Sequence, residues 1–112
     1  MDYQKWSNTS FANVLEYNML AAEMTEDLAV QLAQHGNHIH RSVPKNYRFE
    51  VIVTSNDESN FVSISTNDMR TDEAWLNNVR VVALEADYSP KPGMEQICSW
   101  KDVGAVVAKQ LA

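Results

Sequence analysis

Three histidines, His35, His38 and His40, are the clustered side chains of this sequence that have the chemistry of metal ligands. Neutral imidazoles bind zinc, and on an extended segment His38 and His40, two positions apart, would point the same way. A zinc site also needs a fourth ligand or an open position for water. His35 falls at the end of a helical pattern, where a partial positive charge suits the helix dipole. We therefore predict structural or solvated histidines, with metal binding by His35, His38 and His40 as the alternative.

Cys98 is the single cysteine, so the chain cannot form an internal disulfide or a cysteine-based metal cluster. Paired with a histidine it would be the one cysteine nucleophile available, and a place near a helix start is the only local feature that would activate it. We interpret Cys98 as a packing residue. Because the cysteine count fits a reducing compartment, we expect a cytoplasmic protein.

Other patterns typical of enzymes are missing. Asp57 and Glu58 lie in a polar run that lacks the glycine and the ligand spacing of a calcium loop. The serines form no nucleophile elbow, and three dispersed glycines cannot build a phosphate-binding loop. Carboxylates adjacent in sequence point apart rather than toward one substrate. We predict no enzymatic activity, no catalytic or metal-binding residue and no cofactor.

The first element that would position side chains is a helix over residues 10–35. Its apolar residues recur at helical spacing in two sets. The first set is Phe11, Val14, Leu15 and Ala22, and the second is Leu20, Met24, Leu28 and Leu32. Ser10 or Thr9 is a candidate N-cap, and Gly36 with Asn37 is a candidate stop. Thr25 ahead of two acidic residues also matches a helix start, so one bent helix and two consecutive helices are both open.

Two β-rich runs follow the helix. We interpret residues 37–46, with a proline and few apolar residues, as a connector. Apolar and polar residues then alternate from Tyr47 to Val53, and a second run from Phe61 to Ile64 comes after a polar loop. This pattern predicts an antiparallel hairpin with one solvated face.

The next segment, residues 72–84, leaves helix and strand open. Asp72 and Glu73 ahead of Trp75 indicate a short helix. The β-branched run from Val79 to Leu84 favours a strand.

The C-terminal part contains a break and a helix. Two prolines within residues 89–93 predict a turn that ends any regular element. Ser99 is a candidate cap for a last helix, whose apolar positions run from Trp100 to Leu111 at spacings of three and four.

These elements predict a single α+β domain over residues 1–112. Its core would be a small antiparallel sheet of three or more strands packed against a long N-terminal helix (or helix pair) and a C-terminal helix. The composition, 45% hydrophobic and 21% charged, is that of an ordinary globular chain.

Nine basic and fifteen acidic residues give a net charge of 9 − 15 = −6, and the basic residues are scattered along the chain. Nucleic-acid binding depends on concentrated positive charge, so we expect no nucleic-acid partner. The sequence has no run of ~18 apolar residues, so we expect no membrane span. The acidic residues come as short pairs rather than dense rows, and their simplest role is solubility.

The function that remains is a non-enzymatic binding or protein-interaction domain. A helix from Phe11 to His35 would be about 37 Å long, whereas a sheet of six-residue strands covers ~20 Å. We therefore expect a homodimer that buries part of the N-terminal helix. One alternative is a small-molecule-binding domain with an aromatic-lined pocket. The other is an acidic inhibitor or immunity-type protein for a basic partner.

Overall fold

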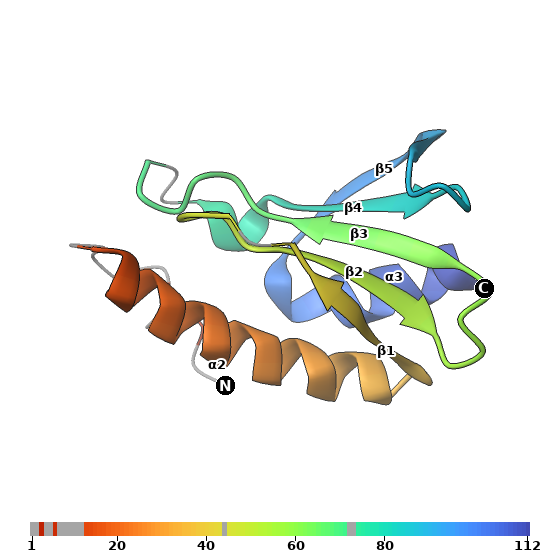
Figure 1. Ribbon diagram of the computed structural model, residues 1–112, viewed down its shortest axis with the longest axis horizontal. Coiled ribbons are helices and arrows are strands. Elements are labelled where there is room, and N and C mark those ends of the chain that lie inside the picture. The colour runs from red at the N-terminus through yellow and green to blue at the C-terminus, as the bar shows by residue number, and fades with distance from the viewer. Residues whose placement is uncertain (1–2, 4–5, 7–12, 44, 72–73) are drawn as a thin grey trace.

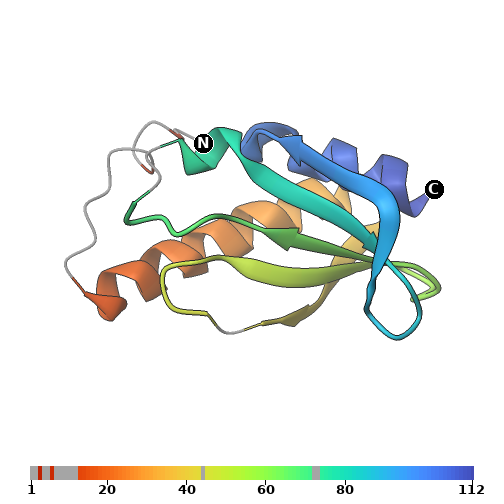
Figure 2. The same cartoon turned by 90° about the horizontal axis from the view of Figure 1, so that it is seen from above.

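The fold is α+β, as the sequence predicts. The computed structural model describes residues 1–112 except 1–2, 4–5, 7–12, 44 and 72–73. Five strands form one antiparallel sheet, with a long helix before it and a shorter helix after it. Both helices lie against the same face of the sheet (Figures 1 and 2). Within the described residues, none of the helices combines the length and the apolar character needed to cross a membrane.

The strands follow one another in space as they do in sequence. In chain order the elements are α2 (Val14–Ala33), β1 (Asn37–Ser42), β2 (Glu50–Ser55), β3 (Phe61–Ser65), the 3₁₀ turn η1 (Trp75–Asn77), β4 (Val79–Leu84), β5 (Pro90–Cys98), the 3₁₀ turn η2 (Trp100–Asp102) and α3 (Val103–Leu111). The sheet order is β1-β2-β3-β4-β5, and each strand is antiparallel to the next. β1 and β5 are therefore its two edges.

Helix α2 is one continuous helix. It begins after Asn13, whose side-chain oxygen accepts a 3.0 Å hydrogen bond from the Glu16 amide, and Gly36 follows its end with a φ of +72°. The second start considered at Thr25 is wrong, because the Thr25 hydroxyl donates to the Ala21 carbonyl inside the helix. The caps predicted at Thr9 and Ser10 lie outside the described residues.

One apolar set of α2 faces the sheet and the other faces solvent. Tyr17, Leu20, Met24, Leu28 and Leu32 are buried. Val14 and Leu15, assigned to the first apolar set, are exposed instead, Leu15 at 68%. A helix packed on one side of a sheet can bury only one such stripe. The apolar residues of the outer stripe are therefore left at the surface.

β1 corrects the interpretation of residues 37–46 as a connector. Asn37–Ser42 pairs with β2 along its length, and a bulge between Ile39 and Arg41 leaves His40 out of register. Ile39 is the strand's one aliphatic residue packed against the core. An edge strand with one solvated face needs little apolar sequence, which is why the pattern did not indicate it.

β5 corrects the turn predicted at residues 89–93. The chain turns earlier, where the Glu85 amide donates to the Ser89 carbonyl, and β5 begins at Pro90. Prolines are tolerated on an edge strand because its outer N–H groups have no ladder partner. A bulge follows, in which Gly93 has a φ of +73°.

The remaining elements follow the predictions in outline. Val79–Leu84 is strand β4, and the short helix expected near Trp75 is the three-residue turn η1, with residues 72–73 outside the description. The C-terminal helix is present, but Ser99 does not cap it: its hydroxyl donates to the Asp102 carboxylate at 2.8 Å.

A tryptophan cluster joins the helices to the sheet. Trp6, Trp75 and Trp100 are each 1% exposed, and Trp6 lies 5.8 Å from Trp100 between ring centroids. Two of the indoles donate to α2: Trp6 Nε1 donates to Glu23, and Trp100 Nε1 donates to Asp27 at 2.8 Å. The large rings thus build the core rather than a surface pocket.

Candidate functional site

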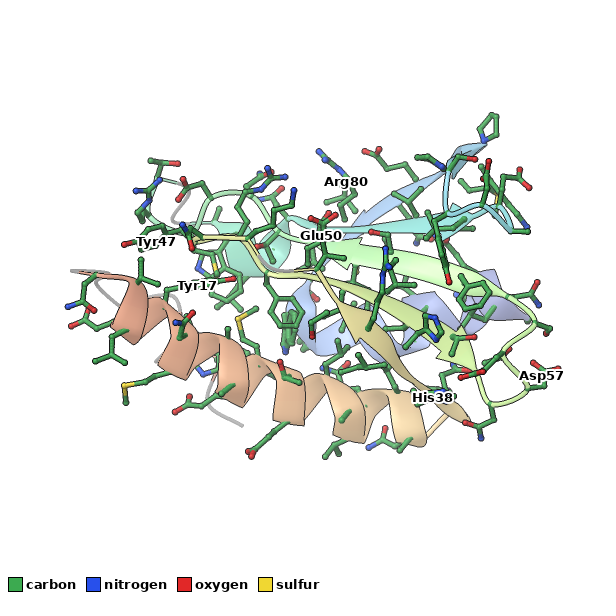
Figure 3. All side chains as sticks on the ribbon, in the orientation of Figure 1. Tyr17, His38, Tyr47, Glu50, Asp57 and Arg80 are labelled. Carbon is green, nitrogen blue, oxygen red and sulfur yellow. The ribbon has the colours of Figure 1, made fainter. Side chains whose placement is uncertain are left out.

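The sheet face turned away from α2 and α3, here called the open face, carries three rows of side chains. Cross-strand pairing places residues of neighbouring strands opposite each other. The first row is Glu50, Ser65, Arg80 and Ile97; the second is Arg41, Ile52, Ser63, Val82 and Glu95; the third is His38, Thr54, Phe61, Leu84 and Pro90. Figure 3 shows Glu50 and Arg80 on the side of the sheet opposite α2.

The centre of the open face is apolar and largely shielded from water. Ile52 is 5% exposed and Leu84 is 7% exposed, although neither belongs to the core cluster beneath the helices. Val82, in the same row as Ile52 and two residues before Leu84 on β4, is half-buried. These residues form a floor that longer side chains surround.

Four charged residues surround this floor. Arg80 pairs with Glu95 across β4 and β5, with 3.2 Å between Nε and Oε1. Arg41 and Glu50 stand on diagonal positions of β1 and β2, and within the described residues neither has an ion pair. The Arg41 guanidinium instead lies over the Tyr88 ring, 5.1 Å from its centroid. The four charges sum to zero, so the face has no net attraction for a polyanion.

The ring of Tyr88 forms one wall. Tyr88, at the turn between β4 and β5, has a φ of +68°. Its ring lies 5.4 Å from the Phe61 ring, and its hydroxyl lies 3.3 Å from His40 Nε2. A positive φ is uncommon in a bulky residue and persists only where the surrounding structure stabilises it. At Tyr88 the contacts to Phe61, His40 and Arg41 provide this stabilisation.

The floor, the four charged residues and the Tyr88 wall border a hollow of about 430 Å³ that is open to solvent, here called the open-face hollow. This volume falls in the range of small-molecule sites. Two serines add hydroxyl groups to the lining: Ser63 lies between Ile52 and Val82 in the second row, and Ser65 lies between Glu50 and Arg80 in the first. The hollow offers an apolar contact, hydrogen-bonding groups and charges of both signs, the kinds of group that line small-molecule sites. Among its described lining residues there is no nucleophile paired with a general base.

The histidines singled out by sequence are only partly brought together. His38 Nε2 lies 3.4 Å and His40 Nδ1 3.8 Å from the same Glu58 oxygen, whereas His35 sits in the turn after α2. His38 Nδ1 lies 3.2 Å from the side-chain oxygen of Asn56, which can accept a hydrogen bond from the imidazole. Across the described part of the chain, no three histidine, cysteine, aspartate or glutamate side chains form a group that could hold a metal ion.

The other chemical candidates have structural partners. Asp57 accepts hydrogen bonds from the Ser55 and Ser59 hydroxyls and the Ser59 amide, and these bonds, Ser55 first, lower its pKa to about 2. This carboxylate organises the hairpin loop. Burial, followed by the charge of Asp102, raises the pKa of the half-buried Cys98 thiol to about 11. A thiol so protonated at neutral pH is a poor nucleophile.

A second hollow of about 390 Å³ lies between α2 and the segment that joins β1 to β2. Tyr17 and Phe49 line it together with Lys45 and Asn46. The open-face hollow is the larger of these two and is the candidate site.

Comparison with protein-family models, with curated proteins and with solved structures finds no match to this chain. The sequence did not predict that the residues lining the open-face hollow would come together. Two local features of the sequence indicate solvated positions on this face. One is the alternation around Glu50, and the other is the charged Arg80 within an otherwise apolar strand. Only the strand register unites Arg41, Glu50 and Tyr88 at one site.

Proposed function

We propose that this chain is a non-enzymatic binding domain and that the open-face hollow is its binding site. The observation that carries the proposal is the apolar floor of Ile52, Val82 and Leu84, two of them buried, on a sheet face that no helix of the described residues covers. An apolar floor ringed by a few polar and charged groups is the common composition of ligand sites. This is the small-molecule alternative among the functions expected from the sequence.

A blocking substitution tests the site. Val82→Trp places an indole in the hollow, and the probe is anilinonaphthalene sulfonate, whose fluorescence rises in apolar sites. We expect the parent to enhance the fluorescence and Val82→Trp to lose the enhancement at an unchanged melting temperature. Val30→Trp, at a 61% exposed position on the outer side of α2, is the matched control and should behave as the parent. Equal enhancement by the parent and Val82→Trp would refute the site.

A second candidate is self-association through α2, the homodimer expected from the sequence. Leu15 and Met19 are 68% and 65% exposed on its outer stripe, and Val30 lies further along it. The helix carries four acidic residues and no lysine or arginine between Val14 and Ala33. Two copies would repel, so added salt should strengthen such a dimer, whereas it should weaken a complex with a basic partner.

Light scattering coupled to size exclusion separates these cases. For a dimer through α2 we expect twice the monomer mass, with a larger dimer fraction at high salt. Leu15→Lys combined with Met19→Lys should restore the monomer mass. Ile97→Lys, at an exposed apolar position of β5, is the control and should leave the dimer intact. A monomer at every salt concentration would remove this candidate.

A further inference from the structure

We propose that the open-face hollow binds a compact zwitterion with an apolar side chain, the chemistry of a free apolar α-amino acid. The inference rests on the proposed function and names the ligand class for that same site. It follows from which charges of the hollow are already paired and which are not.

Arg80 and Glu95 satisfy each other, since their side chains form an ion pair at 3.2 Å. The charges left for a ligand are Arg41 and Glu50, neither of which has an ion pair in the described residues. Arg41 lies opposite Ile52, and Glu50 is two residues from Ile52 along β2. Side chains on such diagonal positions are within reach of one small molecule.

Their signs select the ligand. A guanidinium binds a carboxylate through paired, charge-assisted hydrogen bonds, and a carboxylate binds an ammonium group. A ligand with only an anionic group would be repelled by the Glu50 carboxylate. A phosphate-rich ligand would gain no net attraction, because the four charges around the hollow sum to zero. A molecule whose carboxylate and ammonium share one carbon atom meets both free charges at once.

The floor selects the third group. Ile52 and Val82 lie in the same row as Arg41, and Leu84 lies in the next row. A side chain that leaves the carbon between the two charged groups would lie over these residues, with the Tyr88 ring beside Arg41 as a wall. An aliphatic or aromatic amino acid would therefore bury its side chain there, while a polar one would gain little.

The experiment titrates nitrogen-labelled protein with L-leucine and follows the amide NMR signals. Two analogues each lack one charge: N-acetyl-L-leucine has no ammonium group, and L-leucinamide has no carboxylate. We expect L-leucine to shift the signals of the open-face strands. Each analogue should bind at least about tenfold more weakly, because it loses one charge-assisted interaction. Leucyl-leucine, in which the charges are further apart, distinguishes a free amino acid from a peptide.

Substitutions assign each charge. Arg41→Gln should weaken L-leucine about tenfold but leave L-leucinamide unchanged, because the group that Arg41 would bind is missing from that analogue. Glu50→Gln should also weaken the binding of L-leucine about tenfold, but it should leave the binding of N-acetyl-L-leucine unchanged. Arg70→Gln is the matched control: Arg70 also lies over a tyrosine ring, 4.1 Å from the Tyr47 centroid, but outside the hollow. It should bind L-leucine as the parent does.

Three outcomes would overturn the inference. The first is that L-leucine does not bind, although the protein enhances the fluorescence of anilinonaphthalene sulfonate and Val82→Trp abolishes that enhancement. In that case the ligand class is wrong and the proposed function stands. The second is binding of L-leucine that Arg41→Gln and Glu50→Gln leave unchanged. The third is no response to either probe, in which case the proposed function fails as well.

Discussion

The backbone amide of Gly104, in the first turn of α3, donates a 2.9 Å hydrogen bond to the side-chain oxygen of Gln31 in α2. The amide group of Gln31 in turn donates to the Trp100 carbonyl and to Asp27, both at 3.1 Å. A Cβ atom on Gly104 would lie 2.8 Å from Gln31 Cβ and 3.2 Å from the Gln31 carbonyl oxygen. The two helices therefore meet at a point where only glycine fits.

Gly104→Ala should destabilise the protein even though alanine favours a helix over glycine by ~1 kcal/mol. The new methyl group meets side chain and backbone of Gln31, and such overpacking costs about 1–3 kcal/mol. Urea unfolding measures the net loss. Ala105→Gly, at an exposed position of the same helix, isolates the propensity effect and should cost ~1 kcal/mol. An Ala variant more stable than the parent would show that α3 does not approach α2 as described.

Two leucines of α2 report which side of the helix is buried. Leu28 is 0% exposed, and Leu28→Ala should cost about 2–5 kcal/mol through lost burial and a cavity. Leu15→Ala, on the outer stripe, should change the free energy of unfolding by less than about 0.5 kcal/mol. Thermal or urea unfolding of both variants checks the pair. Similar losses from the two would contradict the orientation of α2.

The stability of the protein should fall at high pH because of Tyr3. Burial, then the hydrogen bond from its hydroxyl to Asp27 and the charge of Asp27, raises the pKa of Tyr3 to about 12, from an ordinary value of 10.0. A pKa raised in the folded state contributes stability that is complete below about 10 and is lost as the pH rises through about 12. Unfolding measured across this window should be less pH-dependent for Tyr3→Phe. The same slope in both proteins would contradict the contact.

Cys98 should react slowly with alkylating reagents. Its pKa, raised from 9.0 to about 11 by burial and the charge of Asp102, lowers the thiolate fraction at neutral pH about 100-fold. Iodoacetamide followed by mass spectrometry measures the rate, and the same protein in concentrated guanidinium is the control. Native and unfolded protein reacting at one rate would refute the assigned environment.

The sequence predicts the elements that carry a strong local pattern. Alternation indicated β2, a β-rich run after a polar loop indicated β3, and helical spacing indicated α2 and α3. The edge strands were missed because β1 has one core-facing aliphatic residue, Ile39, and β5 contains two prolines. Helical spacing also could not decide which apolar stripe of α2 is buried, since Leu15 and Leu20 are the same kind of residue. That choice depends on packing partners distant in sequence.

The candidate site was less predictable than the fold. The histidines attracted notice because they are close in sequence, yet only His38 and His40 share a neighbour, Glu58. Arg41 and Tyr88 are 88 − 41 = 47 positions apart and meet through the pairing of several strands. Residues that depend on register in this way leave no spacing signal in the sequence.

The two edge bulges also limit how this sheet can grow. A regular, unpaired edge is a template for strands of other molecules and for fibril growth. At β1 the bulge at His40 interrupts the ladder, and at β5 Pro90 and Pro92 remove two N–H donors before the bulge at Gly93. An incoming strand would find a continuous row of donors and acceptors at neither side. These irregularities should therefore disfavour edge-to-edge aggregation of the folded protein.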